Sequence, residues 1–291
     1  MDTHNIKAFL LVAETGSFSQ AAEKLHLTQP AVSKRVAALE NQLDSILFDR
    51  IGKTISLTEA GTALLPHAES INQRIADAEL SIRELSGVIA GKLSLATSHH
   101  IGLHKLPGVL RRFTETYPQV QLDIEFMDSE KAYEQIMRGK VELAVVTLAP
   151  VIDDCLQAAS IWPDPLHIAI SENHPLAKSS SIELIQLSEY PAILPDLNTY
   201  TGRIVKTLFQ QQELSLDVSM STNYLETIKM MVTIGLGWSI LPASILTPPL
   251  LSIPLQEVQL ERQLGYVYHR SRSLSNAAKA FITQLEESSS I

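Results

Sequence analysis

One short segment of the chain places hydrogen-bond donors and cations on one side of a predicted helix: Gln29, Ser33, Lys34 and Arg35. The apolar residues of the same segment recur at steps of four, three and four: Val32, Val36, Leu39 and Leu43. That spacing is typical of a helix buried along one stripe. Amide and hydroxyl groups can hydrogen-bond to DNA base edges, whereas cations contact phosphates. The segment has the character of a recognition helix whose N-terminal end enters the major groove.

The residues around this helix predict how it is held. Ser17 begins a shorter preceding helix, His26-Leu27 makes a tight turn, and Thr28 is a suitable N-cap for the second helix. Pro30 falls in the first turn of that helix, where its missing N–H costs no hydrogen bond. Ser17, Ser19 and Pro30 complete the face that we expect to contact DNA. A plain helical hairpin with solvated charges is the alternative that this pattern leaves open.

Two short β-prone runs follow, residues 47–50 and 53–57, on either side of Gly52. They predict a hairpin, or wing, after the recognition helix. Arg50 and Lys53 in this hairpin can reach phosphates or the minor groove. Thr58 then caps a long helix.

These motifs resemble the N-terminal domain of LysR-type transcriptional regulators over residues 4–65. The matching motifs are F-x-x-V-A-E-x-G-S-F-S-x-A-A from Phe9, Q-P-A-V-S from Gln29, L-E-x-x-L from Leu39, L-F-x-R from Leu47 and L-T-x-A-G from Leu57. One departure is Asp44, where the family usually carries the glycine that ends the recognition helix. Aspartate can take the same left-handed geometry at some cost. The resemblance implies a winged helix-turn-helix that binds double-stranded DNA.

The composition of the 291 residues fits a globular protein of two or three units, with 45% hydrophobic and 19% charged residues. The net charge of −9 argues against general coating of nucleic acid. Affinity for DNA must then come from locally placed cations, and we expect it to fall steeply with salt.

A single cysteine, Cys155, excludes an internal disulfide and agrees with a reducing cytoplasm. A redox-sensing role for Cys155 is the alternative. The N-terminal apolar run, residues 8–13, is short and bracketed by charges, so we expect no signal peptide. Glycines and prolines interrupt the apolar stretch at residues 230–255, so we expect a helix, a buried strand and a proline-rich loop there. These features predict a cytoplasmic protein without a membrane segment.

The long helix after Thr58 carries an a/d heptad seam with steps of 4, 3, 4, 3, 4 and 3: Leu64, Ala68, Ile71, Ile75, Ala78, Ile82 and Leu85. Such a narrow stripe favours pairing with a second helix. The alternative is an amphipathic helix lying on its own domain, and Pro66 predicts a bend near the start. We expect a homodimer that presents two recognition helices to an interrupted inverted repeat.

Beyond Gly87, predicted strands and helices alternate. We expect strands at residues 92–97, 120–126, 141–147, 166–170, 192–194, 238–241 and 263–269. We expect helices at residues 100–117, 132–138, 202–212, 224–234 and 274–285, with a crossing point at 163–165. This alternation predicts a parallel α/β sheet, and two similar lobes joined by crossovers would form a hinged cleft.

The same region resembles, more weakly, the effector domain of LysR-type regulators, which is similar to periplasmic binding proteins. The matches lie at Gly91–Leu95, Gly139–Val145, Thr201–Arg203 and Gly235–Pro242. The implied fold is an α/β two-lobed, periplasmic-binding-protein-like domain that binds a small molecule between its lobes. The resemblance also implies a homodimer or homotetramer, with RNA polymerase as a further candidate partner.

These observations predict three segments. Residues 1–58 form the winged helix-turn-helix domain, 59–89 the linker helix and 90–291 the effector domain. We expect lobe I at about 90–162 and 268–291, and lobe II at about 163–267.

Ligands in open α/β sheets lie beyond the carboxyl ends of strands. The first strand ends in Thr97-Ser98-His99-His100, which leads directly into a helix N-terminus suited to an anion. The resemblance places the second wall at these residues: Thr147, Thr199, Tyr200, Thr201 and Asn223, with Arg203 as a further contributor. Together they predict a small oxyanion or carboxylate as effector, although any one of these hydroxyls can serve only as a helix cap.

Other classes of site fit the sequence less well. His99, His100 and His104 suggest a metal, but no Cys, Asp or Glu lies nearby in sequence, so cap and surface roles are preferred. The chain carries no P-loop, G-x-S-x-G, H-E-x-x-H or C-x-x-C motif. We therefore expect no metal, cofactor or catalytic residue. An effector-binding α/β protein with enzymatic activity is the alternative function, and a free-standing solute-binding protein is a third.

Overall fold

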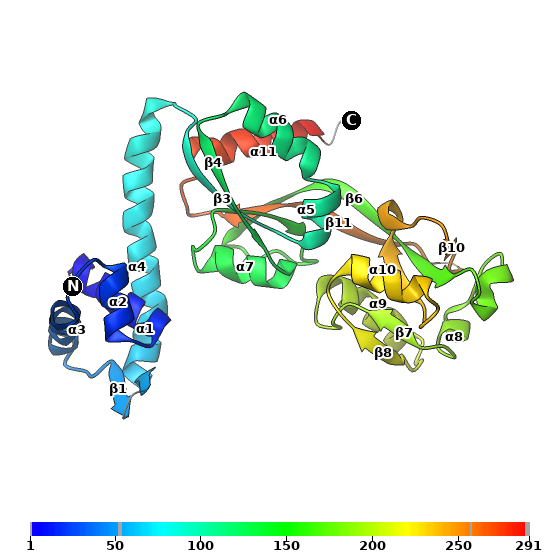
Figure 1. Cartoon of the computed structure of the whole chain (residues 1–291), viewed down its shortest axis with the longest axis horizontal. Coiled ribbons are helices and arrows are strands. Elements are labelled where there is room, and N and C mark those ends of the chain that lie inside the picture. Colours follow the sequence, from blue (N-terminus) through cyan, green and yellow to red (C-terminus); the bar gives the residue numbers. More distant parts are fainter. Residues whose placement is uncertain (1, 52–53, 257, 289–291) are drawn as a thin grey trace. The chain divides into compact units, whose positions relative to one another are not determined.

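The computed structural model describes residues 2–51, 54–256 and 258–288. The chain divides into two compact units, Met1–Ser86 and Gly87–Ile291. Figure 1 shows the helices of the first unit in blue and cyan and the mixed sheet of the second in green to red. Each unit has its own hydrophobic core.

The first unit is a helix-turn-helix with a wing and a long helix. Its elements are α1 (Thr3–Thr15), α2 (Phe18–Lys24), α3 (Gln29–Leu43), β1 (Phe48–Ile51), β2 (Thr54–Leu57), α4 (Glu59–Arg83) and the short 3-10 helix η1 (Glu84–Ser86). Strands β1 and β2 pair antiparallel. The ring of Phe48 on the wing lies 5.3 Å from that of Phe9 and 5.9 Å from that of Phe18. The wing is thus anchored in the core of the helices.

Local geometry explains several of the sequence motifs. The Ser17 hydroxyl accepts the Gln20 N–H at 3.3 Å, which confirms it as the cap of α2. Thr28 is the N-cap residue of α3, as expected, with an extended backbone, although its side chain makes no capping hydrogen bond. Asp44 ends α3 with φ of 49°, the left-handed geometry expected of it. A Cβ at Gly61 would lie 2.2 Å from the Leu47 carbonyl oxygen, so only glycine fits where α4 crosses the wing.

The two halves of the heptad seam of α4 differ in burial. Its first half packs into the core of its own unit through Leu64, Ala68 and Ile71. Its second half does not, because Ile82 is 72% exposed and Leu85 is 84% exposed. The helix runs through Pro66 without ending. The first half of α4 therefore lies on its own unit, as in the alternative interpretation, whereas pairing through the exposed half stays a prediction.

The second unit alternates strands and helices along the chain. Its strands are β3 (Gly91–Thr97), β4 (Val120–Phe126), β5 (Leu143–Thr147), β6 (Leu156–Ser171), β7 (Ala192–Leu194), β8 (Val218–Ser221), β9 (Ser239–Pro242), β10 (Leu250–Ile253) and β11 (Leu260–His269). Its helices are α5 (His99–His104), α6 (Pro107–Thr116), α7 (Ser129–Met137), α8 (Leu184–Leu187), α9 (Tyr200–Gln211), α10 (Leu225–Thr233) and α11 (Asn276–Ser288), with 3-10 turns η2 (Pro175–Lys178) and η3 (Ala243–Ile245).

One sheet runs through both lobes of this unit. Its order is β10-β6-β11-β5-β3-β4, and β9 also pairs with β6. In lobe I, α6 and α11 lie on one face and α7 on the other (Figure 1). The rings of Phe113 and Phe281 meet at 5.0 Å between α6 and α11. In lobe II, Trp238 stacks on Phe209 at 5.8 Å within a second core.

The strand that joins the lobes differs from the sequence expectation. We expected a strand only from residue 166, after a crossing point at 163–165, but β6 is continuous over Leu156–Ser171. Residues 163–165 pair with β11 on one side, whereas β9 and β10 pair with β6 only from residue 166 onward. Pro163 and Pro165 are tolerated because the strand is open on its other side at this place.

Two further expectations need correction. The single helix expected over residues 100–117 is two helices, α5 and α6, because Pro107 begins a new helix rather than continuing the old one. The stretch expected as a proline-rich loop contains strand β10. None of the helices in the described part of the chain combines the length and the apolar character that crossing a membrane requires.

Candidate functional site

The face of α3 opposite its buried stripe carries the predicted DNA contacts. Gln29, Pro30 and Lys34 are exposed, whereas Ser33 and Arg35 are half-buried. The Gln29 side-chain amide donates to the Ser33 hydroxyl at 2.9 Å, so these two groups are already oriented toward one another. Their roles in reading DNA stay predictions.

The remaining predicted DNA contacts lie on α2 and the wing. Ser19 is exposed on α2, and the Ser17 hydroxyl is used as its cap. The backbone of Arg50 pairs with Ile55 in the wing, but its side chain is outside the described part of the structure. Gly52 and Lys53 also lie outside the described residues.

In the second unit, polar side chains from both lobes surround one small cavity of about 50 Å³. Eight of the nine residues expected at the effector site line it: Ser98, His99, His100, Thr147, Thr199, Tyr200, Thr201 and Asn223. About 10–15 Å³ is enough for one water molecule, so this cavity has room for a few water molecules or a small ligand.

Thr97 is the expected residue that does not line the cavity. Its side chain is fully buried, and its hydroxyl donates to the Val145 carbonyl at 2.8 Å. This hydrogen bond joins β3 to β5. The structure therefore gives Thr97 a place in the sheet rather than in the cavity wall.

A buried ion pair lies beside the cavity on β6 and β11, and its Arg262 lines the cavity. The Arg262 Nε donates to the Asp164 carboxylate at 2.8 Å, and its Nη1 donates to the Thr201 hydroxyl at 2.7 Å. Asp164 is 1% exposed and Arg262 is 9% exposed. Arg262 thereby connects the crossover strands to the first turn of α9.

His100 faces the same cavity without a hydrogen-bond partner on either ring nitrogen. It is 7% exposed, and its Nε2 lies 3.9 Å from the Asp164 carboxylate. Burial, together with the positive charge of Arg262, lowers the pKa of His100 to about 3. The ring is therefore neutral near pH 7 and offers one donor and one acceptor to a ligand.

The other histidines considered for a metal bridge the lobes instead. The His99 ring lies 5.3 Å from that of Phe126 and 4.8 Å from that of Tyr224. His104 Nε2 lies 2.6 Å from a Glu226 carboxylate oxygen on α10. Among the described residues, no three His, Cys, Asp or Glu side chains gather as a metal site would require.

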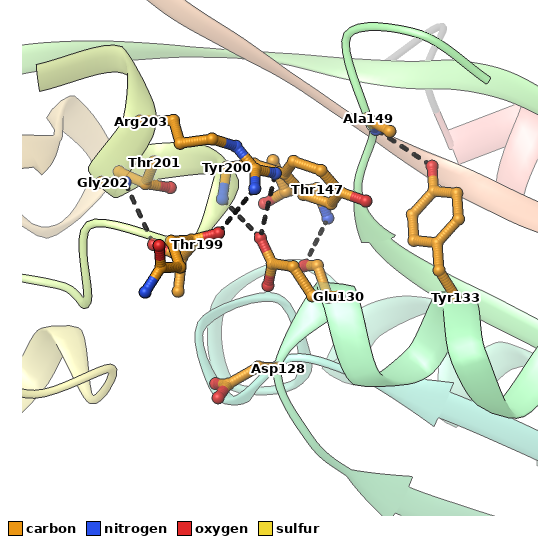
Figure 2. Close-up of polar contacts among 12 residues, drawn as sticks. Asp128, Glu130, Tyr133, Thr147, Ala149, Thr199, Tyr200, Thr201, Gly202 and Arg203 are labelled. Carbon is orange, nitrogen blue, oxygen red and sulfur yellow. Dashed lines mark hydrogen bonds and ion pairs between the residues drawn. The ribbon is translucent and has the colours of Figure 1, made fainter. Parts of the chain in front are cut away.

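Sequence reasoning missed the acidic residues of lobe I that line the cavity. Asp128 accepts a hydrogen bond from the Asn223 side chain at 2.8 Å, and Glu130 accepts one from the backbone N–H of Tyr200. Figure 2 shows the contacts of Glu130 with both Tyr200 and Arg203, and the Arg203 guanidinium lies 3.9 Å from the Glu130 carboxylate. Asp128 and Glu130 follow the carboxyl end of β4. The rule that ligands lie beyond the carboxyl ends of strands, which led to Ser98, applies to them as well. Arg262 gave no such signal.

The two carboxylates restrict what the cavity can accept. Asp164 offsets the charge of Arg262, and Arg203 lies 3.9 Å from Glu130, which leaves the carboxylate of Asp128 as net negative charge. A free anion about 4 Å from an ionised Glu130 would meet a repulsion of about 4 kcal/mol at an effective dielectric constant near 20. Burial raises the pKa of Glu130, which reflects the cost of keeping this carboxylate charged.

A winged helix-turn-helix joined to a two-lobed domain with a polar cavity defines a DNA-binding protein that carries a ligand-binding module. The family model described as "Bacterial regulatory helix-turn-helix protein, lysR family" matches residues 3–62, and that described as "LysR substrate binding domain" matches residues 86–290. The chain belongs to the LysR family of transcriptional regulators. It is a DNA-binding regulator with an effector-binding domain and not an enzyme.

Similar proteins include regulators matched over nearly the full length. The transcriptional activator CmpR of Synechocystis sp. is 30% identical over 287 residues, which cover 97% of this chain and 94% of CmpR. A regulator from the ibpB-leuC intergenic region of Azotobacter vinelandii is 60% identical over 107 residues, which cover 37% of this chain and 74% of that protein.

Solved structures share the fold. Full-length OxyR from Pseudomonas aeruginosa has a TM-score of 0.72 at 22% identity, covering 100% of this chain and 95% of that one. CbnR in complex with its target DNA has a TM-score of 0.66 at 21% identity, covering 99% of this chain and 100% of that one.

Proposed function

We propose that this regulator is switched by a small-molecule effector, a small anion, that binds in the cavity between the two lobes of the second unit. The observation that carries the proposal is the convergence of polar groups from both lobes on one cavity, with His100 buried there and both its ring nitrogens without a partner. Buried polar groups normally have partners, so a ligand or water is the expected occupant.

The effector would act by binding one arrangement of the lobes better than another. Its differential affinity shifts the population between two DNA-bound assemblies. The assembly is a homodimer through the exposed half of α4, and further contacts between effector domains make a tetramer. The protein acts in the cytoplasm, and its DNA target is an interrupted inverted repeat. RNA polymerase is a further partner.

Calorimetric titration with sulfate, phosphate, acetate and malonate tests the anion site. Ser98 lines the cavity, and its hydroxyl makes no capping bond to α5, so it is free for a ligand. We expect Ser98→Ala to weaken binding about tenfold, the effect of a hydrogen bond to a charged group. Exposed Ser180→Ala is the matched control. Anion binding that is equally strong in both variants would contradict this placement.

A further inference from the structure

The cavity already contains a carboxylate that belongs to the protein. Glu130 on α7 of lobe I accepts the N–H of Tyr200, the first residue of α9 in lobe II. The N–H of Gly202, two residues further along α9, is bound instead by the Thr199 hydroxyl at 3.0 Å. Arg203 stacks over the Tyr200 ring at 4.7 Å and places its charge 3.9 Å from Glu130. A backbone N–H, a helix N-terminus and a guanidinium are the groups that recognise a carboxylate.

Resting on the proposed function, we propose that the effector is a small carboxylic acid whose carboxylate replaces that of Glu130 at the N-terminus of α9. The Glu130 side chain is then the resident occupant of the effector's own subsite. Its displacement removes a contact between α7 and α9, and thus between the lobes.

Charge favours replacement over addition. Asp128 and Glu130 both line the cavity, so an added anion would bring a third carboxylate beside them. Replacement leaves the number of negative charges in the cavity unchanged, because Glu130 is only half-buried and can turn toward water. The rest of an acid would then meet His100, whose two unpartnered nitrogens face the same cavity.

Two lobe contacts beside Glu130 would remain after its displacement. Asp128 is bound by the Asn223 side chain at 2.8 Å, and His104 lies 2.6 Å from Glu226. The lobes therefore stay linked while the contact at α9 changes. A carboxylate ligand alters one interlobe contact, which suits a switch between two closely related arrangements.

The test is chemical rescue of Glu130→Ala in the full chain. This substitution removes the CH₂ and carboxylate groups that acetate can supply, so acetate is the matched probe. The temperature of thermal unfolding is measured at increasing concentrations of acetate, acetamide or methylammonium. The acetate midpoint is the acetate concentration that gives half of the maximal rise in unfolding temperature. We expect it to be at least tenfold lower in Glu130→Ala than in wild type. Acetamide and methylammonium should give no such difference. Glu130→Gln, which keeps the shape of the side chain but removes its charge, should also bind acetate more tightly than wild type.

Glu134→Ala is the control, because Glu134 is exposed on the same helix and does not line the cavity. It should bind acetate as wild type does. Equal acetate midpoints in wild type and both Glu130 variants would overturn replacement. Methylammonium that binds wild type and loses affinity in Glu130→Gln would also overturn it. That result would indicate a cationic effector in the cleft, which contradicts an anionic effector but keeps control by a small molecule. Operator binding that responds to no small molecule at all would instead overturn the proposed function.

Hydrogen exchange gives a second readout. The peptide that contains Tyr200 should exchange faster in Glu130→Ala than in wild type, and acetate should slow it again. Unchanged exchange of that peptide on adding acetate would count against occupation of the α9 N-terminus.

Discussion

His100 is a neutral imidazole in the cavity wall, and this has a consequence for stability. Its pKa is about 3 in the folded protein against 6.5 for an ordinary histidine, because burial and the charges of Arg262, His104 and Lys105 disfavour the imidazolium. Below pH 6.5 the unfolded chain binds a proton at this site that the folded protein does not. Stability is therefore lost as the pH falls from 6.5 toward 3.

His100→Gln should remove this part of the pH dependence. The contribution of His100 approaches about 1.4 kcal/mol per pH unit within that window. Urea unfolding can be followed by tryptophan fluorescence, because both tryptophans, Trp162 and Trp238, belong to the second unit. Wild type should lose stability more steeply below pH 6.5 than His100→Gln, and exposed His167→Gln should behave as wild type. Parallel curves for wild type and His100→Gln would show that His100 is not held neutral.

Gln29 and Ser33 should govern sequence preference rather than overall affinity. A well-formed contact to a base contributes about 1–3 kcal/mol of discrimination. Gln29→Ala and Ser33→Ala should therefore lose more affinity for the selected operator than for random duplex, whereas Arg50→Ala should weaken both and lower the salt dependence. Gln42→Ala, exposed toward the other end of α3, is the control. Equal losses on both duplexes for Gln29→Ala and Ser33→Ala would argue against base readout.

Single residues were predictable where a general rule applied to them. The end of β3 led to Ser98 and the family resemblance led to Thr147, and both residues line the cavity. Glu130 followed the same rule after β4 and was overlooked. Arg262 gave no sequence signal, because its partners Asp164 and Thr201 are distant along the chain and meet only when the two crossover strands form.

At the scale of elements, α4 shows that one heptad pattern can continue from a buried half of a helix into an exposed half. The heptad period of the seam could be predicted from the sequence. The residue at which α4 leaves the core of the first unit could not. That point depends on where α1 ends against α4, which is a tertiary contact. The helix boundary between α5 and α6 had a visible signal in Pro107, whereas the continuity of β6 through two prolines depended on which side of the strand is paired.

Ile82→Asp should break the proposed homodimer, since Ile82 is 72% exposed in the single chain and lies on the seam. A charge in a paired seam would be buried without a partner, so we expect at least a tenfold weaker dimer by sedimentation. Ala76→Asp puts the same charge one position beyond Ile75, outside the seam, and should leave the dimer intact. An unchanged dimer for Ile82→Asp would exclude this half of α4 as the interface.

The crossover strands carry the buried pair Asp164–Arg262, which should matter for the stability of the second unit. Arg262→Met leaves Asp164 buried without its partner, and we expect a loss of about 3–5 kcal/mol. Asp164→Leu combined with Arg262→Met should recover much of that loss. Arg111→Met, which removes an exposed pair with Glu115, should cost at most about 1 kcal/mol. Urea unfolding measures all four proteins, and equal losses for Arg262→Met and Arg111→Met would contradict a structural role for the buried pair.

At the scale of the whole molecule, the chain combines a DNA-reading unit with a ligand-binding unit although its net charge is −9. The family and the fold class were predictable from short motifs, because the helix-turn-helix and the wing depend on local spacing. The composition of the cavity was less predictable, because it depends on how two lobes close on one another. The chemical identity of the effector therefore has to be inferred from the residues of the cavity and not from the sequence motifs.

Selection from a pool of genomic DNA fragments, at a defined salt concentration, tests the central claim most directly. The full chain should retain fragments that share an interrupted inverted repeat, with half-sites about one helical turn apart or a multiple of it. The same selection with cell extract supplies an effector if specific binding requires one. A folded dimer that enriches no shared sequence in either selection would contradict the account of this protein as a sequence-specific, effector-responsive regulator.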